Sequence, residues 1–215
     1  MKAATIQATQ NATIHDLSAH RGTQARQSAT PNPPVVIETD TYLGKNNGDD
    51  WTLELFEQAW KLSLEAMDEA LRQPGARRAV LVLGIPASGK STLIAANKRP
   101  GDVILDEAKL VYADRRDAAK EVALKSGLPV EVIWVDTPLS VCQERNNKRP
   151  DNRRPPDRIL EEADQLLKSN PPTTAEGFAA IHRVSGTAKP AMQSGAALKR
   201  SPPVVGRPGR DLACC

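Results

Sequence analysis

The clearest hydrophobic pattern of the chain lies in residues 53–71. Apolar side chains recur there at intervals of three and four residues, the spacing of one face of an amphipathic helix. They are Leu53, Phe56, Trp60, Leu64, Met67 and Leu71. Asp49 or Asp50 is a suitable N-cap for this helix, and Pro74 with Gly75 ends it. The sequence therefore predicts a long helix that packs on a core through one face.

Strand-forming runs follow this helix. Residues 79–83 are a continuous apolar run and read as a strand that is buried on both faces. Residues 103–105 and 130–135 read as two more central strands, and residues 178–184 read as a last strand. Each run is separated from the next by a stretch with helical character. Strands that alternate with helices form a mostly parallel sheet with helices on both faces, so the predicted fold class is α/β.

Helix signals lie between these strands. One helix is expected over residues 113–126, where Gly127 closes it, and a second over residues 138–148, where Thr137 caps it and Pro138 opens it. A third helix starts at residues 155–156, which are both proline.

The composition divides the chain into three segments. Residues 1–49 are rich in Thr, Gln, Asn, Ala and Pro, and residues 185–215 are rich in Gly, Ala, Pro and basic side chains. Such segments bury too little apolar surface to offset the entropy of ordering, so we expect largely disordered termini around a domain at residues 50–184. The run of residues 35–37, V-V-I, is either part of the disordered segment or an edge strand of the sheet.

Composition and charge exclude several classes of protein. The 215 residues include 29 basic and 26 acidic ones, and a net charge of +3 is not typical of a dedicated DNA-binding protein. Aromatic residues make up only 3%, too few for the stacking surfaces that bind single strands. No apolar run reaches the roughly 18 residues of a membrane helix. We expect a cytoplasmic protein with no membrane span, and the polar N-terminal segment leaves open an exported bacterial effector.

The strongest motif follows the strand expected at residues 79–83. Residues 84–91 read G-I-P-A-S-G-K-S and fit G-x-x-x-x-G-K-[ST] at every fixed position. In this pattern the glycines let the backbone approach a phosphate group, and successive amide groups and the start of the next helix surround it. Lys90 supplies a charge for the β- and γ-phosphates, and Ser91 supplies a hydroxyl for Mg²⁺.

The sequence therefore predicts a site for a nucleoside triphosphate, taken as ATP, with Mg²⁺ as cofactor. Ser91 is the expected metal ligand. The residues expected to contact the nucleotide are Gly84, Ala87, Ser88, Gly89, Lys90, Ser91 and Thr92.

Two further features favour phosphoryl transfer. Asp106 ends the run at residues 103–105, so it is expected at the same sheet edge as the loop, where a carboxylate accepts a hydroxyl proton or orders Mg²⁺. A helix cap is the alternative interpretation of Asp106. The segment at residues 144–158 is rich in arginine, and Arg149, Arg153 and Arg154 are expected to form a lid over the transferring phosphoryl group.

Taken together, these motifs resemble those of polynucleotide-kinase-like P-loop kinases and, at the same level, zeta-toxin-like kinases. The resemblance covers roughly residues 78–184 and includes V-D-T-P at residues 135–138 and E-G-F at residues 176–178. It implies a P-loop kinase fold and transfer of the ATP γ-phosphate to a hydroxyl of a nucleic-acid end or a nucleotide-like acceptor. In that interpretation Lys90 and the lid arginines act in catalysis, and Asp106 is the candidate base.

The chain departs from the family pattern in one respect. In the family an Asp-bearing strand follows the first helix, and a second strand ending in Asp precedes the helix that leads to the lid. Between Lys90 and Asp136 the sequence has one such strand, so Asp106 is either the family's base or the carboxylate of the second strand. Two alternative functions remain: a zeta-toxin-like toxin or exported effector, and an ATP-binding interaction module that lacks catalysis.

Overall fold

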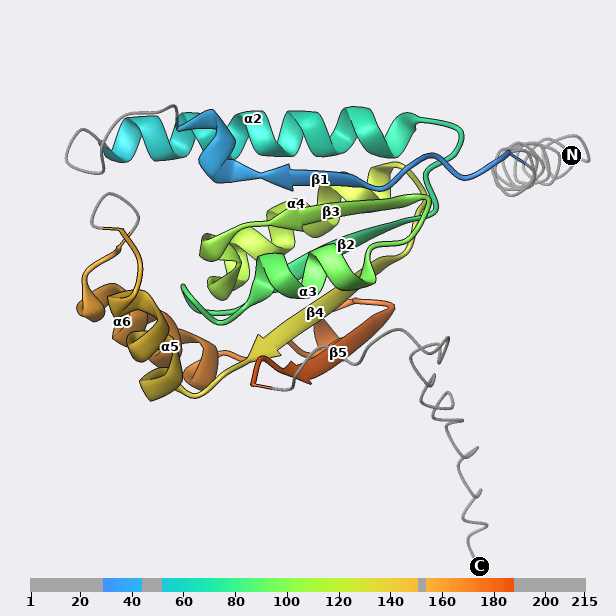
Figure 1. Ribbon diagram of the computed structural model, residues 1–215. Coiled ribbons are helices and arrows are strands. Elements are labelled where there is room, and N and C mark those ends of the chain that lie inside the picture. Colours follow the sequence, from blue (N-terminus) through green and yellow to red (C-terminus); the bar gives the residue numbers. More distant parts are fainter. Residues whose placement is uncertain (1–28, 44–51, 151–153, 188–215) are drawn as a thin grey trace, which may run out of the picture.

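The computed structural model describes residues 29–43, 52–150 and 154–187 (Figure 1). Its centre is a five-stranded sheet in the order β1-β3-β2-β4-β5, and every pair of neighbours is parallel. The strands are β1 (Val35–Glu38), β2 (Arg78–Leu83), β3 (Asp102–Asp106), β4 (Val130–Asp136) and β5 (Ala180–Ser185). The predicted α/β fold with a parallel sheet is confirmed.

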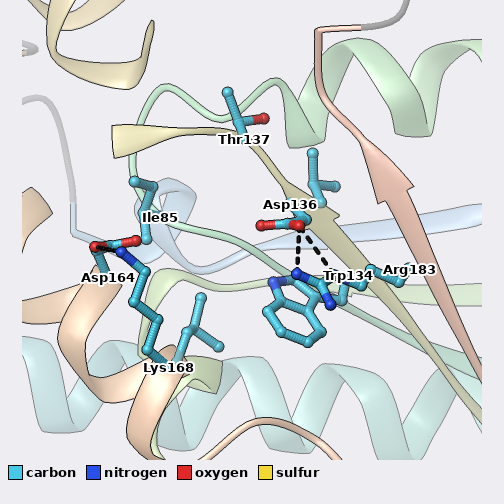
Figure 2. A pocket seen from close by; sticks show the side chains of 9 residues that line it. Ile85, Trp134, Asp136, Thr137, Asp164, Lys168 and Arg183 are labelled. Carbon is cyan, nitrogen blue, oxygen red and sulfur yellow. Dashed lines mark hydrogen bonds and ion pairs between the residues drawn. The ribbon is translucent and has the colours of Figure 1, made fainter. Parts of the chain in front are cut away.

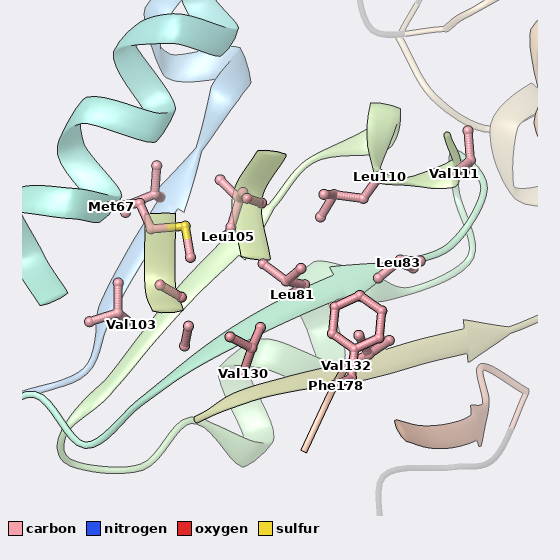
Figure 3. Close-up of a cluster of buried hydrophobic side chains, with 14 of the residues drawn as sticks. Met67, Leu81, Leu83, Val103, Leu105, Leu110, Val111, Val130, Val132 and Phe178 are labelled. Atoms are coloured by element: carbon pink, nitrogen blue, oxygen red, sulfur yellow. The ribbon is translucent and has the colours of Figure 1, made fainter. Parts of the chain in front are cut away.

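Helices cover both faces of this sheet. Helices α2 (Leu53–Arg72) and α4 (Ala113–Lys125) pack on one face, where they meet the larger cluster of buried apolar side chains (Figure 3). The short helix α3 (Lys90–Asn97) packs on the other face and inserts Ile94 among residues of β2, β3 and β4. Strand β2 is therefore buried on both sides, as the continuous apolar sequence of residues 79–83 predicts.

Strand β1 comes from residues 1–49, the segment that was expected to be largely disordered. It pairs with β3 over its whole length, with Val36 opposite Ile104 and Ile37 opposite Leu105. Residues 35–37 thus form the edge strand that was one of their two interpretations. Between α3 and β3 the chain has no other strand, and all of its residues there are described. The place beside β3 is filled by a strand from before the phosphate loop.

Two helix starts differ from the sequence prediction. The N-cap of α2 is Thr52, whose Oγ1 accepts a hydrogen bond from the Leu55 amide at 3.3 Å, whereas Asp49 and Asp50 lie outside the described residues. Helix α5 (Leu139–Asn147) begins after Pro138 as expected, but Thr137 does not cap it. The Thr137 hydroxyl instead donates to the Ser88 carbonyl oxygen at 2.8 Å.

The remaining elements end where the turn residues predict. Gly127 follows α4 with a φ of 67°, in the left-handed region that favours glycine. Helix α6 (Asp157–Ser169) starts after Pro156.

In the described part of the chain, no helix combines the length and the apolar character that a membrane crossing requires.

A buried arginine joins α4 to the segment before β5. Arg116 is fully buried, and its guanidinium pairs with Glu176, with Nε 2.8 Å from Oε2. It also donates to the carbonyl oxygens of Leu110, Val111 and Asn170. Because every one of these contacts is long-range or crosses a turn, the network fixes the connection around η5 (Thr174–Glu176) to the body of the fold.

Removing the carboxylate of this pair should destabilise the fold. Glu176→Gln leaves the charge of Arg116 buried without its counter-ion, and we expect the free energy of unfolding in urea to fall by about 3 kcal/mol. The control is Glu144→Gln, which removes an exposed carboxylate paired with Lys148 and should not measurably change that free energy. Equal stability of the two variants would contradict the structural role of the buried pair.

Candidate nucleotide-binding site

The loop of residues 84–89 connects β2 to α3 at the carboxyl edge of the sheet. Gly84 has no room for a side chain, because an added Cβ would lie 2.6 Å from Ser88 Oγ and 2.9 Å from the Val135 carbonyl oxygen. Gly89 has a φ of 102° and forms the N-cap of α3. Ala87, with a φ of 62°, is the only non-glycine residue with positive φ in the described part of the chain. The loop thus has the tight bend that lets backbone amides approach an anion.

Lys90 forms hydrogen bonds with the backbone on the inner side of the loop. Its Nζ donates to the carbonyl oxygens of Gly84, at 3.0 Å, and Ile85, at 3.4 Å. Desolvation lowers the pKa of this ammonium group, and the carboxylate of Asp106 opposes that effect. A partly desolvated cation at the positive end of a helix provides strong attraction for a phosphate group.

Asp106 lies beside the first turn of α3. It ends β3 opposite Val82 of β2, and its Oδ2 accepts a hydrogen bond from Ser91 Oγ at 3.3 Å. Burial raises the pKa of this carboxyl, while Lys90 and the Ser91 hydroxyl act in the opposite direction. The alternative interpretation as a helix cap is wrong, because the N-cap of η3 (Ala108–Val111) is Glu107, whose side chain accepts from the Lys109 amide.

The lid arginines are in different situations. Arg149 is exposed, and its charge lies near enough to Lys90 to lower the pKa of that ammonium. Arg154 donates to the carbonyl oxygens of Asn147 and Arg149, so it closes the end of α5. Arg153 lies outside the described residues. Thr92, expected at the nucleotide, is exposed on α3.

A further arginine of the same segment contacts the outer side of the loop. Arg145 of α5 donates to the carbonyl oxygens of Ser88, at 3.2 Å, and Gly186, at 3.0 Å. Gly186 follows β5 directly and sits against the loop so closely that an added Cβ would overlap with Ser88 O and Thr137 Oγ1. The sequence showed no motif around Gly186, and Arg145 stood out only as one of several basic residues. The Ser88 hydroxyl, in contrast, is buried and has no hydrogen-bond partner among the described residues.

A small cavity of about 80 Å³ borders the loop on the side of α6 (Figure 2). Arg183 lies over the ring of Trp134, 4.4 Å from the centroid, and pairs with Asp136 at 2.7 Å. Asp164 and Lys168 of α6 form a second ion pair in the wall. The charged side chains that line the cavity are therefore paired with one another.

The comparison with known families agrees with this geometry. Residues 93–172 match the model of a family described as an AAA domain, a P-loop NTPase family that includes kinase-like members. The match spans less than half of the chain and begins after the phosphate loop. No match was found among curated proteins. The loop and the family match are thus separate observations, and both indicate binding of a nucleoside triphosphate.

Gly186→Ala should disturb the loop although residue 186 lies about one hundred positions away from it. Its Cβ meets a backbone oxygen, which cannot rotate away, so the contact with Ser88 must open. We expect a lower melting temperature and an affinity for Mg-ATP weakened about tenfold or more, measured by calorimetry. Gly127→Ala is the control for ATP affinity, because its Cβ would meet nothing within 4 Å and the strain at its φ of 67° is confined to the turn after α4. Equal ATP affinity of the two variants would contradict the proposed contact.

Asp106→Asn should be more stable than the wild type at neutral pH. Because burial raises the pKa of Asp106, the folded state keeps a proton that the unfolded state has already lost, and stability falls as the pH rises from the ordinary value of 3.8 through the raised pKa. Asparagine does not titrate, so the gain in unfolding free energy should grow over this window and then stay constant. Urea unfolding between pH 4 and pH 7.5 measures it, with Asp114→Asn on the exposed side of α4 as control. A gain that does not depend on pH would contradict this account.

Proposed function

We propose that the protein is an ATP-dependent phosphotransferase that moves the γ-phosphate to a hydroxyl of a nucleic-acid end or a nucleotide-like acceptor. The observation that carries this proposal is the contact between Ser91 and Asp106. It joins a hydroxyl at the start of the loop helix to a carboxylate on the neighbouring strand, and the charge of Lys90 opposes the rise that burial causes in the pKa of that carboxyl. The resemblance to polynucleotide-kinase-like and zeta-toxin-like kinases supports the same reaction class.

The residues present fit a magnesium nucleotide. Mg²⁺ prefers hard oxygen ligands and usually keeps several waters, so one hydroxyl and one carboxylate from the protein are sufficient beside the phosphate oxygens. Ser91 Oγ and Asp106 Oδ2, 3.3 Å apart, are the two oxygens that would hold it. When bound, the ion would neutralise charge on the β- and γ-phosphates. The described residues contain no cluster of three or more His, Cys, Asp or Glu side chains that suits a metal held by the protein alone.

The phosphate chain of ATP would lie along the loop. Lys90 supplies positive charge to the β- and γ-phosphates, and the amide groups at the start of α3 supply the other donors. Because the transition state of phosphoryl transfer is loose, most of the rate comes from positioning and from neutralisation of charge.

The lid supplies the remaining positive charge in this proposal. Arg149 is the arginine whose charge reaches Lys90, so it is the first candidate to face the transferring group. Arg154 supports the lid backbone through its bonds to Asn147 and Arg149. Arg153 remains a proposed lid residue because it belongs to the same arginine-rich segment.

The alternative of a module without catalysis loses its main support. It was motivated by a strand missing after the loop helix, and β1 fills the place beside β3. A toxin or exported effector would use the same chemistry on a particular acceptor, so it is tested by the choice of acceptor and by growth after expression of the wild type and Lys90→Ala.

Lys90→Ala should weaken the binding of Mg-ATP by about 10- to 100-fold, because charged hydrogen bonds to phosphate are lost. Lys98→Ala, which removes an exposed lysine just beyond α3, is the matched control and should bind as the wild type does. Isothermal calorimetry measures both dissociation constants. Equal affinity of the two variants would remove Lys90 from the site.

Formation of ADP tests the transfer itself. The protein is incubated with Mg-ATP and a panel of 5′-hydroxyl oligonucleotides, UDP-sugars and NAD. We expect ADP formation that depends on one acceptor class and is lost in Lys90→Ala and in Asp106→Asn. A wild type that binds Mg-ATP and forms no ADP with any acceptor would refute the proposed transferase.

A further inference from the structure

The end of β1 brings a second acidic segment to the edge of the sheet that carries the loop. Glu38, the last residue of β1, lies opposite Asp106 in the parallel register. The chain then turns into η1 (Thr39–Tyr42), which begins where the strand ends. Figure 1 shows this turn, in blue, at the same end of the sheet as the start of α3 and the helices α5 and α6.

Contacts of Thr39 and Leu43 fix the backbone of this turn. Thr39 is buried, and its Oγ1 accepts a hydrogen bond of 2.9 Å from Ser63 Oγ of α2. Leu43 is 2% exposed, and its amide donates to the Asp40 carbonyl oxygen. Asp40 lies between these two anchors, and it is exposed. The backbone that carries its carboxylate is therefore fixed while the carboxylate itself faces outward.

The parallel register brings this carboxylate to the edge of the sheet where the loop lies, because η1 follows Glu38, which is paired with Asp106. Asp40 raises the pKa of Lys90 and also that of Asp106, so its charge reaches both members of the site. The other charged groups that act on Lys90 are Asp106, Glu107 and Arg149. Glu38 acts on Asp106.

Asp106 and Asp40 lie on different sides of the site and can have different roles. Asp106 accepts from the Ser91 hydroxyl and lies with it on the side of α3 where the cation would be held. Asp40 comes from the far side of β3, from an element that makes no hydrogen bond with the loop in the described residues. An acceptor hydroxyl that attacks the γ-phosphate in line needs a base on the side away from the leaving ADP.

We propose that Asp40, carried by the strand that precedes the phosphate loop, is the catalytic base that takes the proton of the acceptor hydroxyl; this inference rests on the proposed phosphotransferase function. The acceptor O–H bond breaks and its proton moves to the Asp40 carboxylate. The acceptor oxygen forms the new bond to the γ-phosphorus, and the bond from that phosphorus to the β,γ-bridging oxygen breaks, so ADP leaves with the electron pair. Asp106 then serves the cation and not the acceptor.

The test compares Asp40→Asn with Glu38→Gln, which removes a neighbouring exposed carboxylate at the same strand end. We expect Asp40→Asn to lower the rate of acceptor-dependent ADP formation by about 100-fold or more. The affinity for Mg-ATP should not fall. Glu38→Gln should stay within about threefold of the wild type in both measurements. Asp40→Asn with a rate near that of the wild type overturns the proposal, and so does a loss of rate matched by an equal loss of affinity or melting temperature.

A second measurement needs no acceptor. If Asp40 faces the triphosphate, Asp40→Lys should tighten the binding of ATP by about threefold to tenfold at low salt, because a repelling charge becomes an attracting one. Glu65→Lys, at an exposed position of α2, should leave it unchanged. Unchanged ATP affinity in Asp40→Lys overturns the placement of Asp40. A wild type that binds ATP but transfers to no acceptor refutes the phosphotransferase, while tighter binding by Asp40→Lys would still support the placement.

Discussion

The site depends on where the carbonyl oxygens of one short loop point. Each peptide unit has an acceptor opposite its donor, so amides can surround an anion only if the carbonyl groups of the same loop find partners elsewhere. Lys90 donates hydrogen bonds to the carbonyl oxygens of Gly84 and Ile85 on the inner side of the bend. Thr137 and Arg145 donate to the carbonyl oxygen of Ser88 on the outer side. The loop is thus held in a conformation suited to phosphate by interactions that do not themselves require phosphate.

The outside contacts tie the loop to three elements that follow it in the sequence. Thr137 comes directly after β4, Arg145 lies on α5, and Gly186 comes directly after β5. In a parallel sheet, every strand ends at the same edge, so residues that follow different strands meet there. The segment before β5 is fixed in turn by the pair of Arg116 and Glu176. Stability of the distant segment and geometry of the loop are consequently linked through packing.

The sequence allowed prediction of those features that are encoded locally. The strands β2, β3 and β4 are recognised from apolar residues that are close together in the chain, and the loop is recognised from residues that are adjacent. The cap of α5 was predicted wrongly, because a Thr before a Pro is a good local cap and the competing partner, Ser88, lies 49 positions away. Gly186 and Arg145 could not be assigned for the same reason: their contacts with the loop exist only after the sheet has formed. The position of Asp106 at the sheet edge that carries the loop was inferred from strand direction alone, and its hydrogen bond with Ser91 agrees with that inference.

The position of β1 shows what order along the chain cannot reveal. Counting strands after the loop helix finds one too few, and a missing strand suggests a missing catalytic group. A sheet, however, requires only that an edge of β3 be paired by a strand of suitable length and apolar face, wherever in the chain that strand originates. Ile37 and Leu105 satisfy this requirement side by side on the face covered by α2. Because β1 runs parallel to β3, the residues that follow it must arrive at the edge where the loop lies. The same pairing that completes the sheet therefore brings Asp40 to the edge of the sheet where the loop lies.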